Sequence, residues 1–190
     1  MQIRPYQKED EQGWLRCRVV SFLNTAYYDN VLREKETYAN DSIELVAVEN
    51  NHLIGLIDVE IESEQRTICT RDHGLGGMIW HLAVHPDHQR KGIARKLLQK
   101  AEDRAKEKGL RYVEAWTRDD APVLNWYQTN GFTHFHSYLH VYVDRKEEVS
   151  SPIDGLHVLQ AFGHYYGDEG VKIKALFERV HECNGLEKLL

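Results

Sequence analysis

The stretch HLAVHPDHQRKGIARKLL, residues 81–98, decides the fold of this chain of 190 residues. An apolar run ends at Pro86, a short basic loop follows, and Gly92 opens a segment with apolar residues at helical spacing. Gly92 has no side chain, so a ligand can approach the backbone there closely. The unpaired N–H groups of the helix's first turn and the positive end of its dipole favour an anion such as a phosphate or diphosphate. The stretch therefore predicts a strand, an anion-binding turn and a helix in succession.

The flanking segments alternate between strand and helix patterns. Met78–Val84 is a nearly continuous apolar run, which is typical of a buried strand. The helical spacing from Gly92 continues to Lys108, and Gly109 supplies the stop. Ile43–Glu62 predicts a hairpin around two asparagines that tolerate positive φ. Further elements are predicted at 3–6 (strand), 14–23 (helix), near 31–38 (short helix), 112–117 (strand), 121–130 (helix) and 132–143 (strand).

Three motifs in this order carry a resemblance to a known family. QRKGIA, residues 89–94, is similar to the Q/R-x-x-G-x-G/A signature of the GNAT superfamily, the coenzyme A-dependent N-acyltransferases. The preceding LAVHP, residues 82–86, resembles the family's central strand. DAPVLNWYQTNGF, residues 120–132, resembles its N-x-x-A-x-x-x-Y-x-x-x-G-F element, with Tyr127 at the tyrosine. The resemblance spans residues 3–143 and is most specific over 78–132.

The resemblance implies a mixed α/β (α+β) fold and a donor. The expected sheet is mostly antiparallel, has six or seven strands, is flanked by helices, and contains a splayed parallel pair, residues 78–84 and 112–117. Acetyl-CoA is the implied cosubstrate, with no metal. The N–H of Leu82 or Val84 would hold the thioester carbonyl, and Tyr127 would be the general acid that protonates the departing thiolate. The implied cofactor-binding residues are Leu82, Ala83, Val84, Gln89, Arg90, Lys91, Gly92, Ile93, Ala94, Asp120 and Tyr127.

Asp120 departs from the family pattern, which often has asparagine there. Its carboxylate can accept a bond from a pantetheine amide but cannot donate one. An N-cap for the helix that begins at Ala121 is an equally good interpretation.

The general base has no obvious candidate. Family members often carry Glu or His two or four residues before Leu82, and here those positions are Trp80 and Met78. Strand alternation sends His81 to the face opposite Trp80 and Leu82, so His81 is expected to be misdirected. Trp80 and Trp116 either line an acceptor pocket that attracts a cation or fill the core. Three acids on neighbouring strands are left open as bases acting through water: Asp58, Glu60 and Glu114.

Composition limits the partners and the compartment. The net charge is −6, with 30 acidic and 24 Lys or Arg residues, so no nucleic-acid or membrane partner is expected. No apolar run approaches the length of a membrane span. The three cysteines lack CxxC spacing, which favours a reducing, cytoplasmic location. Histidines 81, 85 and 88 and histidines 134, 136 and 140 match no standard ligand spacing, so no metal site is expected.

The charged, turn-rich stretch RKEEVSSPIDG after Asp144 predicts a boundary. We expect an N-acetyltransferase domain at 1–145 and a C-terminal helical extension at 146–190. Val171–His181 has the spacing of an amphipathic helix, whose apolar face would pack on the sheet or on a second copy, so a homodimer is a hypothesis.

The predicted function is transfer of acetyl from acetyl-CoA to a primary amine by direct attack. The acceptor is either a small molecule or a protein amine. The alternative is an acetyl-CoA-binding sensor or regulatory module that has lost turnover. A dinucleotide-binding fold is disfavoured because no GxGxxG follows an early strand.

Overall fold

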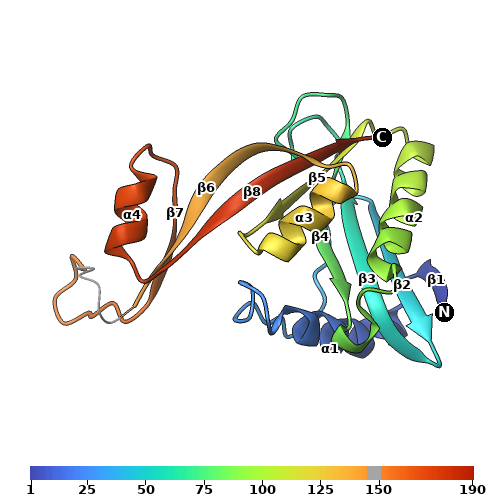
Figure 1. The fold of residues 1–190 in the computed structure, drawn as a ribbon, viewed down its shortest axis with the longest axis horizontal. Helices are drawn as coiled ribbons and strands as arrows, with labels where there is room; N and C mark the ends of the chain where they lie inside the picture. Colours follow the sequence, from blue (N-terminus) through green and yellow to red (C-terminus); the bar gives the residue numbers. More distant parts are fainter. Residues whose placement is uncertain (145–150) are drawn as a thin grey trace.

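In the computed structural model residues 76–107 form a strand, a turn and a helix, and the strand lies in the interior of a mixed sheet (Figure 1). The structure describes residues 1–144 and 151–190. Its strands form one eight-stranded sheet in the order β1-β2-β3-β4-β5-β8-β6-β7. The elements are β1 (Gln2–Pro5), a 3-10 helix (Lys8–Asp10), α1 (Glu11–Phe22), β2 (Ser42–Glu49), β3 (His52–Ile61), β4 (Gly76–Val84), a second 3-10 helix (Pro86–His88), α2 (Ile93–Glu107), β5 (Tyr112–Thr117), α3 (Ala121–Thr129), β6 (Thr133–Val143), β7 (Ala161–Tyr165), α4 (Gly170–Leu176) and β8 (Arg179–Leu189).

The predicted splayed pair is confirmed. β4 and β5 are parallel, and their pairing covers Gly76–Ile79 with Tyr112–Ala115. Beyond Ile79 and Ala115 the two strands diverge, as Figure 1 shows. The other paired strands of the sheet are antiparallel. The mixed α/β fold is therefore as expected, but the sheet has eight strands where six or seven were predicted, because β7 and β8 come from the segment after residue 150.

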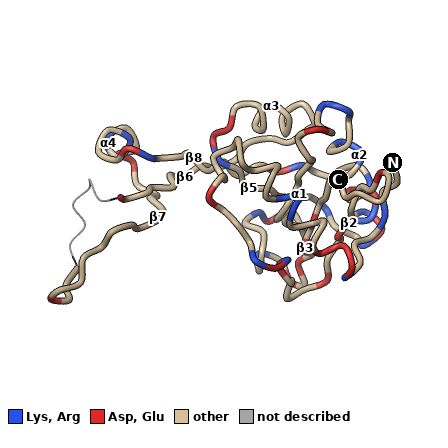
Figure 2. Tube along the Cα trace, turned by 90° about the horizontal axis from the view of Figure 1, so that it is seen from below, with Lys and Arg blue, Asp and Glu red and all other residues tan. Residues whose placement is uncertain are grey.

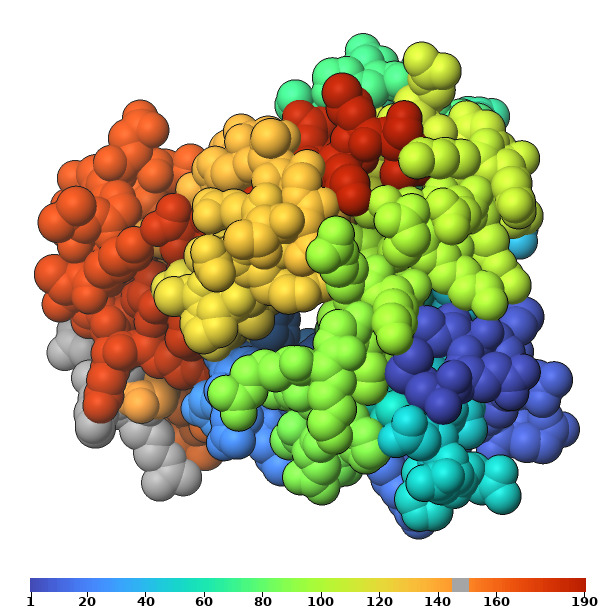
Figure 3. All heavy atoms as spheres, turned by 45° about the vertical axis from the view of Figure 1, so that its right-hand side comes forward, coloured from blue at the N-terminus to red at the C-terminus, as the bar shows by residue number. Residues whose placement is uncertain are grey.

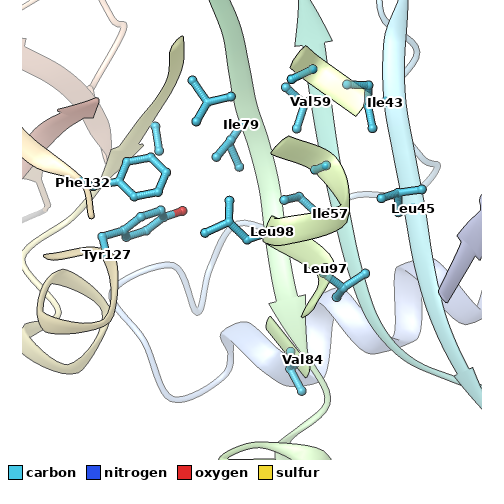
Figure 4. Close-up of a cluster of buried hydrophobic side chains, with 14 of the residues drawn as sticks. Ile43, Leu45, Ile57, Val59, Ile79, Val84, Leu97, Leu98, Tyr127 and Phe132 are labelled. Atoms are coloured by element: carbon cyan, nitrogen blue, oxygen red, sulfur yellow. The ribbon is translucent and has the colours of Figure 1, made fainter. Parts of the chain in front are cut away.

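Helices cover both faces of the sheet. The apolar spacing of α2 places Leu97, Leu98 and Ala101 on Ile57 and Ile79. Tyr127 of α3 and Phe132, in the turn after α3, belong to the same cluster (Figure 4). On the opposite face, Trp14 and Cys17 of α1 pack with Val46, Leu56 and Ala83. Burial of these side chains is the main term that holds the helices on the sheet.

The predicted helix over Val171–His181 is wrong in its second half. Helix α4 ends at Leu176, and β8 begins at Arg179. β8 pairs with β5 on one edge and with β6 on the other, which buries Cys183 and Leu186. Pairing on two edges outweighs the helical spacing of the local sequence. The described part of the segment after residue 150 is thus a mixture of strands and one short helix. The predicted boundary at 145/146 lies outside the described residues. The two-domain division and the homodimer remain predictions.

The short helix expected near residues 31–38 is also wrong. This segment is irregular, and its side chains turn into the protein: Lys35 forms ion pairs with Glu44 and Asp58, and Glu36 bonds to His81. In the described part of the chain, none of the helices has the length and apolar character of a membrane span. Basic and acidic residues are interspersed over the body of the molecule in Figure 2.

Candidate functional site

A cavity of about 1030 Å³ follows the fork between β4 and β5. One end is lined by the first turn of α2 and by α3, and the other by residues 18–36 and by Tyr138 and Tyr166. Figure 3 shows the opening, bordered by α3, by the turn that precedes α2 and by the segment that follows α1. Because the lining includes Ile79 and Tyr127 from the α2 face together with Met78 and Trp116 from the opposite face, the cavity joins the two faces of the sheet.

The turn before α2 is shaped for an anion. Arg90 and Gly92 have positive φ, 58° and 75°, and Gly92 is the N-cap of α2. A Cβ on Gly92 would meet nothing within 4 Å, so the backbone is open to a ligand at this point. Successive N–H groups in such a turn, added to those of the helix's first turn, make an anion-binding concavity. Arg90 and Arg95 line the cavity beside it.

Ten of the eleven predicted cofactor-binding residues line this cavity, and Lys91 does not. The Lys91 ammonium instead donates to the Asp87 carbonyl at 2.9 Å. The Gln89 amide donates to the Val84 carbonyl at 3.0 Å, which ties the turn to the end of β4. Leu82–Val84 lies beyond the last β4–β5 pair, so in the described sheet this edge of β4 has no strand partner. Backbone donors on that edge are available to an extended ligand.

Asp120 is engaged by the protein backbone. Its two carboxylate oxygens each accept the Ala26 N–H at 3.1 Å. It occupies the N-cap position of α3 but makes no side-chain capping bond. The carboxylate therefore fixes the segment after α1 against α3, while the residue still lines the cavity.

Tyr127 lies on α3, and Figure 4 shows its hydroxyl directed toward Leu98 and β4. The residue is 7% exposed and lines the cavity. Its ring packs edge-on against Trp126 and Phe132 at 5.1 and 4.9 Å. Burial, with a smaller effect from the nearby Tyr27, raises the pKa of the phenol well above its ordinary value. Tyr127 therefore keeps its proton and can act as a donor.

Two tryptophans mark the mouth of the fork on the face away from α2. Trp80 and Trp116 are the residues that follow the last paired positions, Ile79 and Ala115. Each indole N–H is held by a carboxylate: Trp80 donates to Glu60 at 2.8 Å, and Trp116 to Glu114 at 2.7 Å. Both rings line the cavity. The position of Trp80 and Trp116 in the cavity wall is therefore compatible with the interpretation that they line an acceptor pocket.

His81 does not follow the expected alternation. The register of β3 and β4 shifts between Asp58 and Val59, which pair with His81 and Ile79 and leave Trp80 as an extra residue in a β-bulge. Leu82 pairs with Ile57 on the α2 face, as expected. His81, however, points to the same side as Trp80 and lines the cavity. The expectation that His81 is misdirected relative to Trp80 is wrong, because the bulge resets the alternation.

His81 belongs to a buried polar group at the cavity wall. Its Nε2 lies 2.5 Å from Glu36 Oε2, and its Nδ1 accepts the Arg18 Nε–H at 3.3 Å. The bond from Arg18 leaves Nε2 as the protonated nitrogen that faces Glu36. This hydrogen bond from His81 is the largest cause that lowers the pKa of Glu36. Glu36 is therefore held as an anion, with its side chain 46% exposed, in front of an imidazole that is 6% exposed.

The three acids that the sequence left open are bound elsewhere. Asp58 bonds to Lys35 and Tyr38, Glu60 to Asn40 and Trp80, and Glu114 to Thr70 and Trp116. These three acids do not line the cavity. Among the residues that the structure describes, no group of three or more His, Cys, Asp or Glu is arranged to hold a metal ion.

Sequence reasoning missed Arg18, Glu36, Tyr138 and Tyr166. They come from α1, the irregular segment after it, β6 and the turn after β7, and all four line the cavity. No local motif marks them, because loops and strand ends far apart in sequence bring them together.

The family model of the acetyltransferase (GNAT) family matches residues 7–132. Among solved structures, a ribosomal-protein-alanine N-acetyltransferase from Brucella melitensis has a TM-score of 0.64 at 15% identity, with 100% of each chain covered. NAA60 from Arabidopsis thaliana, solved with a bisubstrate analogue, has a TM-score of 0.60 at 16% identity over 99% of this chain and 97% of that one. PaiA N-acetyltransferase from Thermoplasma acidophilum, solved with coenzyme A, has a TM-score of 0.55 at 18% identity over 70% and 90%. At these identities the structural likeness shows the fold.

Proposed function

The chain belongs to the acetyltransferase (GNAT) family, and we propose that it carries an acetyl group from acetyl-CoA to a primary amine by direct attack. One observation carries the proposal: a single cavity is lined by the anion-binding turn at Gly92, by the open edge of β4, by Tyr127 and by the Glu36–His81 pair. The Thermoplasma acidophilum enzyme was solved as a complex with coenzyme A, which supports the choice of donor.

The residues at the turn fit the donor. The free space at the Gly92 Cβ position and the left-handed turn suit a diphosphate. The unpaired edge of β4 at Leu82–Val84 suits the amides of an extended pantetheine arm, and the N–H of Leu82 or Val84 would polarise the acyl carbonyl. When bound there, acetyl-CoA supplies an acetyl group already activated as a thioester. The cavity contributes mainly by aligning it with the amine.

Protons are handled at two places on opposite sides of the fork. Glu36 binds the ammonium, and its carboxylate, which keeps the hydrogen bond from His81, accepts the proton and passes it to solvent. The amine nitrogen then bonds to the acetyl carbon while the C–S bond breaks. Tyr127 gives its proton to the departing sulfur, and the second proton that the nitrogen sheds replaces it.

Binding and turnover measured separately test this function. Calorimetric titration should show binding of acetyl-CoA, and a thiol-release assay should detect free coenzyme A only when an amine is present. Binding without thiol release with any amine would favour the alternative, a sensor or regulatory module. That alternative rests on Trp80 and Met78, which occupy the positions where family members often carry Glu or His. Failure to bind coenzyme A at millimolar concentration would refute both.

A further inference from the structure

The amine-binding end of the cavity is a chamber on the sheet face opposite α2. Glu60, Met78 and Glu114 pair directly across β3, β4 and β5, so their side chains share this face. The indoles of Trp80 and Trp116 bond to those two glutamates and lie on the same side. Tyr127 packs in the cluster on the other face. The amine therefore reaches the fork from the tryptophan side, and the donor from the α2 side.

The walls of this chamber are aromatic and held in place. Trp116 contacts Tyr138 at 5.4 Å, and Tyr138 stacks on Tyr166 at 4.9 Å with an interplanar angle of 29°. Trp80, which is 47% exposed, lines the β4 side. Rings fixed in this way offer apolar area and ring faces that attract a cation at little cost in side-chain entropy.

The charges of the chamber leave room for one ammonium. Among the described residues that line its walls, Glu36 is the carboxylate available to a ligand, because Glu60 and Glu114 do not line the cavity and Asp120 holds the Ala26 N–H. Arg18 lines the same wall and is 3% exposed. A second ammonium would meet this buried guanidinium and no carboxylate, which is costly.

We infer that the acceptor is a small primary amine with a single charge, carried on an aromatic or bulky apolar group, as in the arylalkylamines. This inference rests on the proposed function and specifies its acceptor. The ammonium lies at Glu36, and the apolar group lies among Trp80, Trp116, Tyr138 and Tyr166.

An amine panel tests the inference. Phenethylamine, putrescine, spermidine and a short peptide with a lysine are compared as acceptors at saturating acetyl-CoA. The expected kcat/KM for phenethylamine exceeds that for putrescine by about 10-fold or more, because putrescine brings a second ammonium into an unpaired position. A preference for putrescine, spermidine or the peptide would overturn the inference.

Substitutions locate the amine in the chamber. Trp80→Leu and Tyr166→Leu remove exposed rings and should each raise the KM for phenethylamine by about 5- to 10-fold. The matched control is Phe162→Leu on β7, whose ring is 52% exposed and does not line the cavity, and which should leave the KM unchanged. Calorimetric titration of phenethylamine into the coenzyme A complex gives a readout independent of turnover, and the same variants should weaken it.

The outcomes for donor and acceptor are distinguishable. If a variant still binds acetyl-CoA as tightly as the unsubstituted chain, it is folded, and an unchanged KM for phenethylamine in both variants overturns the aromatic chamber. If acetyl-CoA binds but phenethylamine neither binds nor is acetylated, the acceptor class is wrong while the donor site stands. If acetyl-CoA does not bind, the proposed function fails, and the acceptor inference fails with it.

Discussion

Replacing Gly92 by alanine, with Gly109→Ala as its matched control, tests the anion-binding turn directly. The two glycines bracket α2, both have left-handed φ (75° and 80°), and a Cβ on either would meet nothing within 4 Å. The folded-state cost is therefore the backbone strain alone, about 1–2 kcal/mol for a residue with a Cβ. Alanine also restricts the unfolded chain, which returns about 0.4–1 kcal/mol. Both variants should lose about 1 kcal/mol of stability, or about 2–4 °C in Tm for a chain of this size.

The two variants should differ in their affinity for acetyl-CoA. Gly92 lines the cavity and Gly109 does not. The new methyl group at position 92 would stand where we propose that the diphosphate approaches the backbone, so Gly92→Ala should raise the calorimetric Kd about 10-fold, which corresponds to about 1.4 kcal/mol. Gly109→Ala should keep the Kd within about two-fold. Thermal unfolding with and without acetyl-CoA should show the same difference as a smaller ligand-induced shift for Gly92→Ala. Equal affinities for the two variants would refute the assignment of the turn.

Three further predictions concern titratable groups. Tyr127→Phe should lower kcat about 100-fold with little change in the Kd for acetyl-CoA, and a loss below about three-fold would contradict its role as the acid. Glu36→Gln should lower kcat/KM about 100-fold near neutral pH. The fold-decrease in kcat/KM should become smaller as the pH approaches the pKa of the free amine, because more of the amine is then already unprotonated. A fold-decrease that does not vary with pH would contradict proton acceptance at the Glu36–His81 pair. Burial, together with the neighbouring Arg118, lowers the pKa of His140 from 6.5 to about 4. As the pH falls, the unfolded chain therefore binds a proton at His140 before the folded chain does. The stability that the neutral, buried His140 contributes is present above about pH 6.5 and is lost as the pH falls toward 4. The glutamine of His140→Gln can still accept the Arg118 hydrogen bond. This variant should show a smaller change of the free energy of unfolding with pH between about 6.5 and 4, measured by denaturant unfolding. An unchanged pH dependence would contradict its assignment to His140.

The sequence was sufficient where local pattern and tertiary structure agree. The helix from residue 92 to 108 is observed as Ile93–Glu107, and the splayed strands are observed near their predicted bounds. Apolar spacing, the glycine at each end of α2 and the family motifs all point the same way there. β8 was missed because Ile173, Leu176 and Val180 have helical spacing, while the two strand edges that capture Arg179–Leu189 are distant in sequence.

In the candidate site, too, some residues could be predicted from local sequence and others could not. The turn at Gly92 and the position of Tyr127 follow from motifs. The Glu36–His81 pair does not, because the β-bulge that turns His81 into the cavity depends on the register of β3 against β4. Glu36 itself lies on an irregular segment whose course is set by contacts of Lys35 and Glu36 with the sheet. No periodicity could have predicted either contact.

The position of β8 between β5 and β6 also bears on how the chain is made. During synthesis β5 and β6 leave the ribosome well before β8, yet they are not neighbours in the finished sheet. Until Arg179–Leu189 is available, the facing edges of β5 and β6 have unpaired backbone groups. Closing the sheet requires contacts between residues far apart in sequence, and such topologies fold slowly. A nascent chain halted before β8 would leave these edges open to pairing with other chains, which leads to aggregation.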